Sequence, residues 1–267
     1  MKKLLFIVLL FSFSLAQNPT ADRLLASFIE AERTLKVDGD FSENLYFLNR
    51  RPKDKKHFIY PAILSEKLIK ENYNLKILKE EQFLGRNVLV LELKPKYRGP
   101  YWQFIIDKRS ASRLAYKQIS PSGRVLAEGA YFKVRKIIER INPIPKKDLE
   151  LSGAKKDFYK QTFTNAQLPK GYIPVKITGS SLGKDKIPAL RISFFDGLNT
   201  LILLVVLDGS KLTKDSEAMQ SLELRQHFLI AIGPIGKENL VNWLESYKNT
   251  PLNHLDRQEI KSFLRTQ

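Results

Sequence analysis

Two blocks of short alternating segments dominate the chain. In the first block, apolar and polar residues alternate over stretches that turn residues separate, at 75–78, 88–93, 101–106, 113–119 and 125–134. Alternation with a period of two predicts strands, and the short connections predict that successive strands run antiparallel. Gly129 lies inside the last stretch and indicates a bulge or bend there.

A helical pattern precedes this block. Apolar residues recur at near-helical spacing over 24–35, which predicts one amphipathic helix that ends near Thr34. Thr20 has the side chain of a good N-cap and lies at the start of this pattern. Two short strands are expected between the helix and the first block, at 45–48 and 57–60.

The second block is also rich in strands. Its expected strands lie at 172–178, 189–195, 199–207, 222–225 and 228–232. Asp196-Gly197 is a strong hairpin signal, and the unbroken apolar run 201–206 predicts a strand that is buried on both faces. A helix is expected at about 237–247, and Thr250 followed by Pro251 predicts the start of a last one.

These patterns divide the chain into four parts. Two prolines in Asn142-Pro143-Ile144-Pro145-Lys146-Lys147 oppose regular pairing and stiffen a linker. The expected parts are a signal peptide at 1–16, a β-rich domain at 17–142, a linker at 143–150 and a smaller α+β domain at 151–267.

The first residues resemble a signal peptide. Lys2 and Lys3 precede an apolar core of about a dozen residues, which is shorter than the roughly 20 residues of a membrane-spanning helix. Cleavage is expected between Ala16 and Gln17, and an uncleaved anchor helix is the alternative. Because the chain has no Cys, it carries no lipid anchor at the cleavage point. We therefore expect an exported, periplasmic protein.

The amino-acid composition excludes several classes of catalytic and metal-binding site. The absence of Cys excludes disulfides, thiolate nucleophiles and iron–sulfur clusters, and the three His residues lie in separate segments without metal-ligand spacing. No nucleophile elbow occurs, and Gly179–Asp185 lacks the spacing of a phosphate-binding loop. We therefore expect no enzyme, no cofactor and no metal site.

The chain is strongly basic, with a formal net charge of +17. Outside the cytoplasm, nucleic acid is not an expected partner, whereas lipid headgroups, lipopolysaccharide phosphates and acidic proteins are. The alternative is a solvated basic surface that serves solubility. The sequence does not indicate an oligomeric state.

Aromatic and apolar strand residues suggest a ligand pocket in the first domain. The candidate pocket residues are Leu25, Phe28, Val88, Val90, Trp102, Phe104 and Tyr116. The candidate headgroup-binding residues are Arg50, Arg51, Lys55 and Lys56. Such a site would take an amphipathic anionic lipid or an acylated lipoprotein end. The alternative is that the aromatic residues form an ordinary core.

An ordered series of motifs resembles the RseB/MucB family of periplasmic sigma-factor regulators. In the first block the motifs are Glu71-Asn72-Tyr73-Asn74-Leu75, Phe83-Leu84-Gly85-Arg86-Asn87-Val88-Leu89-Val90-Leu91, Leu93-Lys94-Pro95-Lys96, Phe104-Ile105-Ile106-Asp107 and Pro121-Ser122-Gly123-Arg124. In the second block they are Leu168-Pro169-Lys170-Gly171-Tyr172, Phe194-Phe195-Asp196-Gly197-Leu198 and Ile230-Ala231-Ile232-Gly233.

This resemblance implies an α+β fold that is mainly antiparallel β. It implies a LolA-like half-open β-barrel with covering helices, followed by the smaller α+β domain. It also implies a partner, the periplasmic domain of an anti-sigma factor, together with sensing of lipid or lipoprotein. A periplasmic lipid or lipoprotein carrier of LolA type is the alternative function, and an enzyme is the third.

Overall fold

The computed structural model describes 20–46, 64–144, 149–163, 166–182, 187–206, 215–216, 218–224 and 227–250, together with residues 252, 255, 258, 260 and 262. The expected signal peptide, the expected strand at 57–60 and the four candidate headgroup residues lie outside these residues. The chain forms two compact units. The described residues of the first unit are 20–46, 73–96 and 100–144, and the remaining ones form the second.

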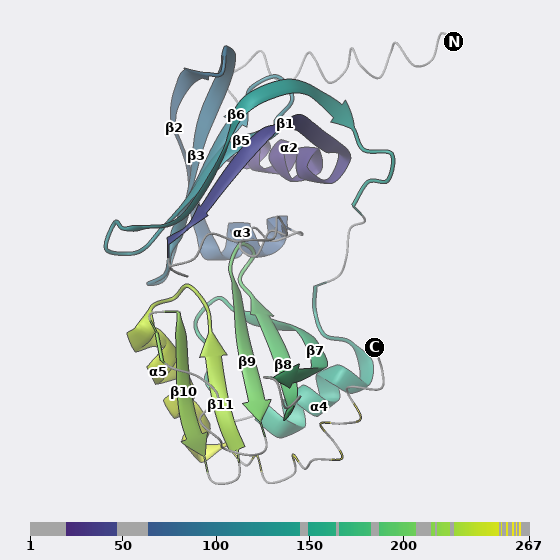
Figure 1. The fold of residues 1–267 in the computed structure, drawn as a ribbon, viewed down its shortest axis with the longest axis vertical. Helices are drawn as coiled ribbons and strands as arrows, with labels where there is room; N and C mark the ends of the chain where they lie inside the picture. The colour runs from purple at the N-terminus through teal and green to yellow at the C-terminus, as the bar shows by residue number, and fades with distance from the viewer. Residues whose placement is uncertain are drawn as a thin grey trace. The chain divides into compact units, whose positions relative to one another are not determined.

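The first unit is a six-stranded antiparallel sheet in the order β1-β6-β5-β4-β3-β2 (Figure 1). Its strands are β1 (Leu35–Leu45), β2 (Tyr73–Phe83), β3 (Arg86–Pro95), β4 (Tyr101–Asp107), β5 (Arg113–Ile119) and β6 (Val125–Glu139). The alternation found in the sequence accounts for β2 to β6. Because β1 and β2 are the two edges and do not pair with each other, the sheet stays open.

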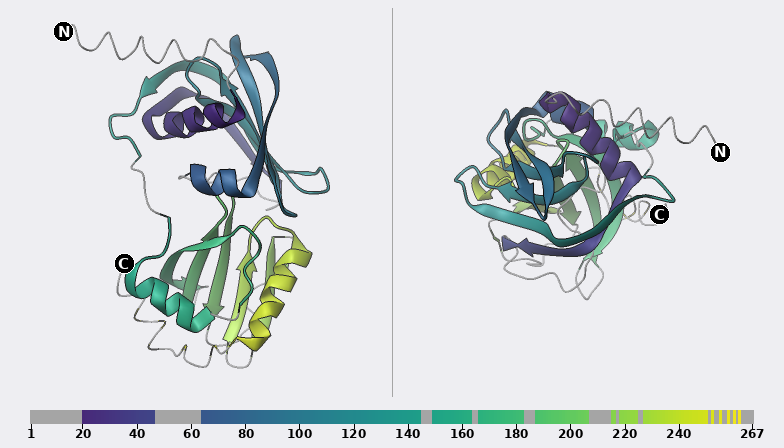
Figure 2. Two further views of the ribbon diagram at one scale, coloured as in Figure 1. Left: turned by 180° about the vertical axis from the view of Figure 1, so that it is seen from behind. Right: turned by 90° about the horizontal axis from the view of Figure 1, so that it is seen from above.

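One helix covers the concave face of this sheet (Figure 2). It is α2 (Ala21–Thr34), and Thr20 caps its N-terminus by accepting a hydrogen bond from the backbone N–H of Arg23. Leu24, Leu25 and Phe28 are fully buried. The predicted helix and its cap are confirmed, because the near-helical apolar spacing places these side chains on one face.

Two local predictions about the first unit are only partly met. The early strand is β1 (Leu35–Leu45), whereas the prediction placed it at 45–48, of which residues 47 and 48 lie outside the described residues. The register runs without a break through Gly129, which pairs with both Glu43 and Tyr116, so there is no bulge at this glycine. β6 has register shifts on either side of this glycine. One is at Leu126, where the strand pairs with Gln118 and Ile119 of β5, and two are where it pairs with residues 38–41 of β1.

The second unit has a five-stranded antiparallel sheet in the order β10-β11-β9-β8-β7. Its strands are β7 (Ile173–Leu182), β8 (Ile187–Phe195), β9 (Thr200–Val206), β10 (Met219–Leu224) and β11 (His227–Ile232). Two helices, α4 (Gly153–Phe163) and α5 (Lys237–Glu245), lie on one face of this sheet (Figure 2). A short 3-10 helix (Ser246–Asn249) follows α5.

Both faces of the second sheet are apolar. Leu201, Leu203 and Val205 of β9 pack in the core on the helix side, which also contains Trp243. Leu204 and Val206 of the same strand belong to a separate buried cluster on the other face. The prediction of a strand buried on both faces is therefore confirmed, and the hairpin at Asp196-Gly197 joins β8 to β9 as expected.

Two short segments from the first half of the sequence belong to the second unit. They are the segment that contains α3 (Glu66–Asn72) and the turn 97–99 between β3 and β4. The Asn72 side chain donates hydrogen bonds to the backbone oxygens of Gly171 and Asp196, at 2.9 and 3.0 Å. The Tyr97 hydroxyl donates to the Asp196 carboxylate.

The fold class is confirmed as α+β, mainly antiparallel β, with two open sheets. The division at 143–150 stays a prediction. It places residues 64–72 and 97–99 in the first domain, whereas the compact units place them in the second. Among the described residues, no helix combines the length and the apolar character needed to cross a membrane.

Candidate functional site

An aromatic cluster lies between α2 and the concave face of the first sheet. Phe28 of α2 contacts Phe104 of β4, with ring centroids 5.0 Å apart. The ring centroid of Trp102 lies 5.7 Å from that of Phe104, in a stacked arrangement, and 5.7 Å from that of Tyr116 on β5. All four side chains are buried. Aromatic pairs at these separations contribute packing beyond the area that they bury.

The cluster continues toward β1. The Phe41 ring centroid lies 4.9 Å from that of Tyr131 and 6.5 Å from that of Tyr116. Gly129 lies beneath these rings, and a Cβ atom there would approach ring atoms of Phe41 and Tyr116 to 2.6 Å. The glycine is therefore required because two rings cross the strand at this point and leave no room for a side chain.

Polar groups lie at the edge of the aromatic cluster. The Tyr116 hydroxyl donates a hydrogen bond to the carboxylate of Glu43 on β1. Burial, followed by this contact with a carboxylate, raises the pKa of Tyr116 far above that of a free tyrosine, so the residue stays protonated. Burial likewise raises the pKa of Tyr131. The hydroxyls are thus fixed donors on an otherwise apolar surface.

An ion pair connects α2 to the sheet beside the aromatic cluster. Arg113 Nε lies 3.6 Å from Glu32 Oε1, and the two side chains are 16% and 22% exposed. The guanidinium carbon of Arg113 also lies 5.2 Å from the ring centroid of Tyr116. Because the pair is partly shielded from water, the attraction between its two charges is screened less than in an exposed pair. It fixes α2 near the aromatic cluster.

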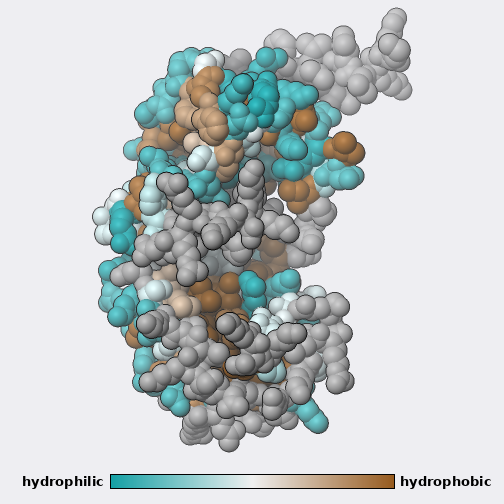
Figure 3. Space-filling model, viewed as in Figure 1, coloured by the Kyte–Doolittle hydropathy of each residue, from teal (hydrophilic) through white to brown (hydrophobic). Residues whose placement is uncertain are grey.

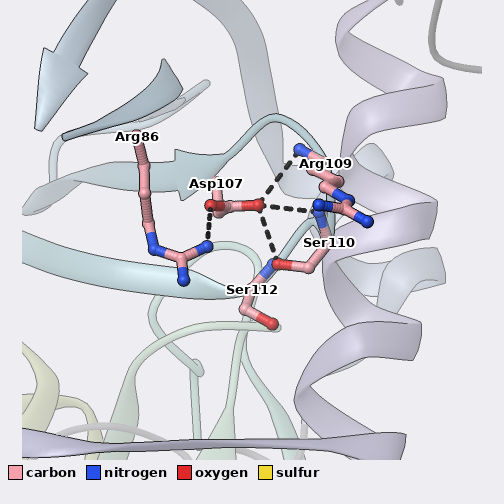
Figure 4. Close-up of polar contacts among 5 residues, drawn as sticks. All are labelled: Arg86, Asp107, Arg109, Ser110 and Ser112. Atoms are coloured by element: carbon pink, nitrogen blue, oxygen red, sulfur yellow. Dashed lines mark hydrogen bonds and ion pairs between the residues drawn. The ribbon is translucent and has the colours of Figure 1, made fainter. Parts of the chain in front are cut away.

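The turn before Arg113 is organised by Asp107 (Figure 4). One carboxylate oxygen accepts hydrogen bonds from the backbone N–H groups of Arg109 and Ser110 and from the Ser110 hydroxyl. The other accepts from Arg86 at 3.0 Å. The carboxylate thus has partners for both oxygens although its side chain is only 3% exposed. This turn sets where β5, and with it Arg113, begins.

The structure divides the predicted pocket residues into two groups. The first group is buried and comprises two residues of α2 and three of the sheet: Leu25, Phe28, Trp102, Phe104 and Tyr116. Val88 and Val90 are also buried, but their register places them on the opposite face. Val90 pairs with Ile105, whereas the adjacent Leu91 pairs with Phe104. Their role in ligand binding stays a prediction.

Sequence reasoning missed the residues that surround this core. Phe41 and Glu43 were overlooked because Asp38, Gly39 and Asp40 make β1 look unlike a strand. The signal was present nonetheless, since Val37, Phe41 and Glu43 are spaced for one strand face. Within the described residues, no group of three or more His, Cys, Asp or Glu side chains is arranged to hold a metal ion.

No family model and no curated protein matches the sequence. Solved structures do match. One is the Pseudomonas aeruginosa MucA/MucB complex, at 12% identity and a TM-score of 0.57, covering 83% of this chain and 95% of that one. A second, MucB in complex with MucA(peri), matches at 13% identity and a TM-score of 0.56, covering 84% and 96%. MucB alone gives 12% identity and a TM-score of 0.53, covering 83% and 94%. The chain therefore has the fold of MucB.

Proposed function

We propose that this chain is an exported, non-enzymatic regulator that binds the periplasmic domain of an anti-sigma factor. The observation that supports this most is the likeness to MucB, because the match covers nearly all of that chain and MucB has been solved with MucA(peri). The ordered motifs in both blocks of the sequence point to the same family independently.

A second part of the proposal is that lipid or an acylated lipoprotein end controls this binding through α2. The concave face under α2 is apolar and aromatic, as an acyl chain requires. The side chains of Phe28 and Phe104 already fill the space between helix and sheet. An acyl chain would therefore enter by displacing α2, and it would have to break the Arg113–Glu32 pair. Ligand binding and a movement of α2 are then one event.

The LolA-type carrier is the less favoured function. A carrier would need only a domain that ends near residue 142. Residues 64–72 and 97–99 pack within the second unit, however, and Asn72 and Tyr97 hydrogen-bond there. A first domain on its own would leave these groups without their partners. This favours a protein that acts with both units present.

The partner is tested with the whole mature chain and the purified periplasmic domain of an anti-sigma factor from the same organism. Isothermal titration calorimetry and size-exclusion chromatography should detect a complex of defined stoichiometry. An unrelated acidic periplasmic domain of equal charge is the control, because a basic protein binds acidic ones without specificity. Equal binding to both domains, or to neither, would refute the proposed regulator.

The proposed control by lipid needs a separate measurement. Adding an acylated lipopeptide should change the fluorescence of Trp102 and lower the affinity for the anti-sigma domain. A variant with Glu32→Gln weakens the attachment of α2 and should bind the lipopeptide several-fold more tightly. Glu30→Gln is the matched control, because Glu30 pairs with Arg33 on the same helix and not with the sheet. If the protein binds the anti-sigma domain but no lipopeptide, the proposed regulator stands and the proposed control by lipid is refuted.

A further inference from the structure

Three exposed apolar side chains lie along the second half of β6 and just beyond it. Among the described residues, the large apolar side chains classed as exposed are Tyr46, Leu78, Leu84, Phe132, Ile138 and Ile141. Three of these six lie within ten residues of one another, and Phe132 and Ile141 are 65% and 98% exposed. In Figure 3, apolar and hydrophilic surface adjoin where β6 ends. Single exposed apolar residues are common, but such a concentration is not.

Cations surround these side chains. The described residues from 132 to 144 contain four Lys or Arg residues and one Glu. Lys133 and Lys136 are exposed, and Lys36 is exposed on the paired strand, beside Ile138. The neighbouring acids offset part of this charge, because Asp38 and Asp40 both contact Arg135 and Asp40 also interacts with Lys133. Residues 36–40 and 132–140 still carry five Lys or Arg side chains against three Asp or Glu. We call Phe132, Lys133, Lys136, Ile138 and Ile141 the ribbon end.

The backbone of the ribbon end is fixed. The Arg140 N–H donates to the Thr34 backbone oxygen at 2.7 Å, and the Ile144 N–H donates to that of Arg33 at 3.0 Å. The Arg33 side chain donates to the Ile144 oxygen in return, at 2.9 Å. Ile141 lies between these two attachments, so its exposure is not the fraying of a loose end. An apolar side chain is held out in water.

We propose that the ribbon end docks the protein onto the surface of a bilayer that carries anionic headgroups. Phe132 and Ile141 would enter the interface between headgroups and acyl chains, while Lys133 and Lys136 would approach the phosphates. A bilayer suits this surface because its apolar side chains protrude one by one among lysines. A protein partner of comparable affinity would need a continuous, shape-matched apolar patch.

This docking goes beyond the proposed binding of an anti-sigma domain. It would hold the protein at the membrane in which such a partner is anchored, and it needs neither α2 movement nor the concave face. Its failure and the failure of the proposed function are therefore distinguishable. A protein that binds the anti-sigma domain and ignores vesicles has the function without the docking surface.

The test is co-sedimentation of the whole chain with vesicles. We expect binding to vesicles of phosphatidylglycerol mixed with phosphatidylcholine, and at least tenfold weaker binding to pure phosphatidylcholine. Lys133→Gln with Lys136→Gln should weaken binding about 25-fold at low salt, because each lysine near an anionic surface contributes roughly fivefold. Salt should reduce this difference, since it screens exposed charges over about 8 Å at physiological strength.

Matched variants separate the ribbon end from charge in general. Lys155→Gln with Lys156→Gln removes the same charge from exposed positions on α4 and should change binding less than threefold. Phe132→Ser with Ile141→Ser should weaken binding about tenfold, and Leu84→Ser, at a distant exposed turn, should not. Equal losses in the ribbon-end and α4 variants would overturn the proposal, as would equal binding to both kinds of vesicle. Ribbon-end variants should still bind a monomeric lipopeptide.

Discussion

The sheets of the two units are covered differently. The first sheet is apolar and aromatic on the face under α2, while its other face combines polar pairs such as Gln103 with Glu92 and the buried Val88 and Val90. The second sheet is buried on both faces, with β9 contributing to both cores. A sheet that one helix covers can expose its core by moving that helix, whereas a sheet packed on both faces has no such movement. The first unit is thus suited to a ligand-dependent change, and the second to holding its shape.

Each unit carries its own fluorescent reporter for this comparison. The chain has two tryptophans, Trp102 in the core of the first unit and Trp243 in that of the second. Variants with Trp102→Phe or Trp243→Phe leave one reporter each. Urea titrations of the two should then show whether the units unfold together or in separate steps. The following substitutions are best made in these backgrounds.

The largest loss of stability is expected for Phe194→Ala in the second unit. The Phe194 ring packs between Tyr159 of α4 and Trp243 of α5, at 6.0 and 5.2 Å between centroids. Because the second sheet is packed on both faces, the cavity left by this substitution cannot easily close. We therefore expect a loss of about 4 kcal/mol in the free energy of unfolding. The Trp243 signal in urea measures it.

Phe104→Ala in the first unit should cost less, about 3 kcal/mol. The cavity would open against α2, a single helix that can settle toward the sheet, and the cost of a cavity depends on such relaxation. Urea titration followed by Trp102 fluorescence gives the value. If Phe104→Ala costs more than Phe194→Ala, the difference in covering does not govern the stability of the units.

The two tyrosine–carboxylate pairs offer a finer comparison. Tyr97 donates to Asp196, whose side chain is fully buried, and Tyr116 donates to the half-buried Glu43. Removing the hydroxyl with Tyr97→Phe should cost about 2 kcal/mol, because the carboxylate stays away from water. Tyr116→Phe should cost about 1 kcal/mol, since Glu43 can regain water. Equal losses would show that the burial of the carboxylate does not decide the effect.

The smallest effect concerns an exposed pair on the outer face of β1. Hydrogen bonds from Arg135 hold the pKa of Asp40 below its ordinary value. A lowered pKa in the folded state means that the pair stabilises the fold above the unfolded pKa, about 3.9, and that this is lost as the pH falls. In Arg135→Gln, NMR titration should show the Asp40 pKa moving upward. Arg124→Gln, at an exposed turn, should leave it in place.

Most of the sheet in each unit was predictable, because alternation and turn residues are local signals. β5 was predicted with its observed bounds, and the predicted span of β4 differs by one residue. The short helices α3 and α4 were missed, since neither has a pronounced apolar stripe in the sequence. Five of the seven predicted pocket residues are buried side chains of α2 or of the sheet face that it covers. The polar neighbours of Tyr116 were not foreseen, because Glu43 lies 73 positions away in the sequence.

The partners of Asp196 were out of reach for the same reason. Asp196-Gly197 is a hairpin signal in the sequence, and the hairpin is present. Nothing local indicates that the carboxylate of this turn also accepts a hydrogen bond from Tyr97. Such contacts depend on which distant segments pack together, and a local pattern carries no information about this.

The placement of α3 and Tyr97 in the second unit has a consequence for the order of folding. Asn72 is separated by 124 positions from the oxygen that it contacts, and Tyr97 by 99 from its carboxylate. A ribosome adds about 5–20 residues per second, so these segments wait roughly 5–25 s after their own synthesis before their partners exist. Until then their apolar side chains, Leu68 and Ile69 among them, have no native site to enter. The packing of α3 and Tyr97 into the second unit should therefore be a late and slow step of folding. A chaperone that holds the unfolded chain should raise the yield of folded protein.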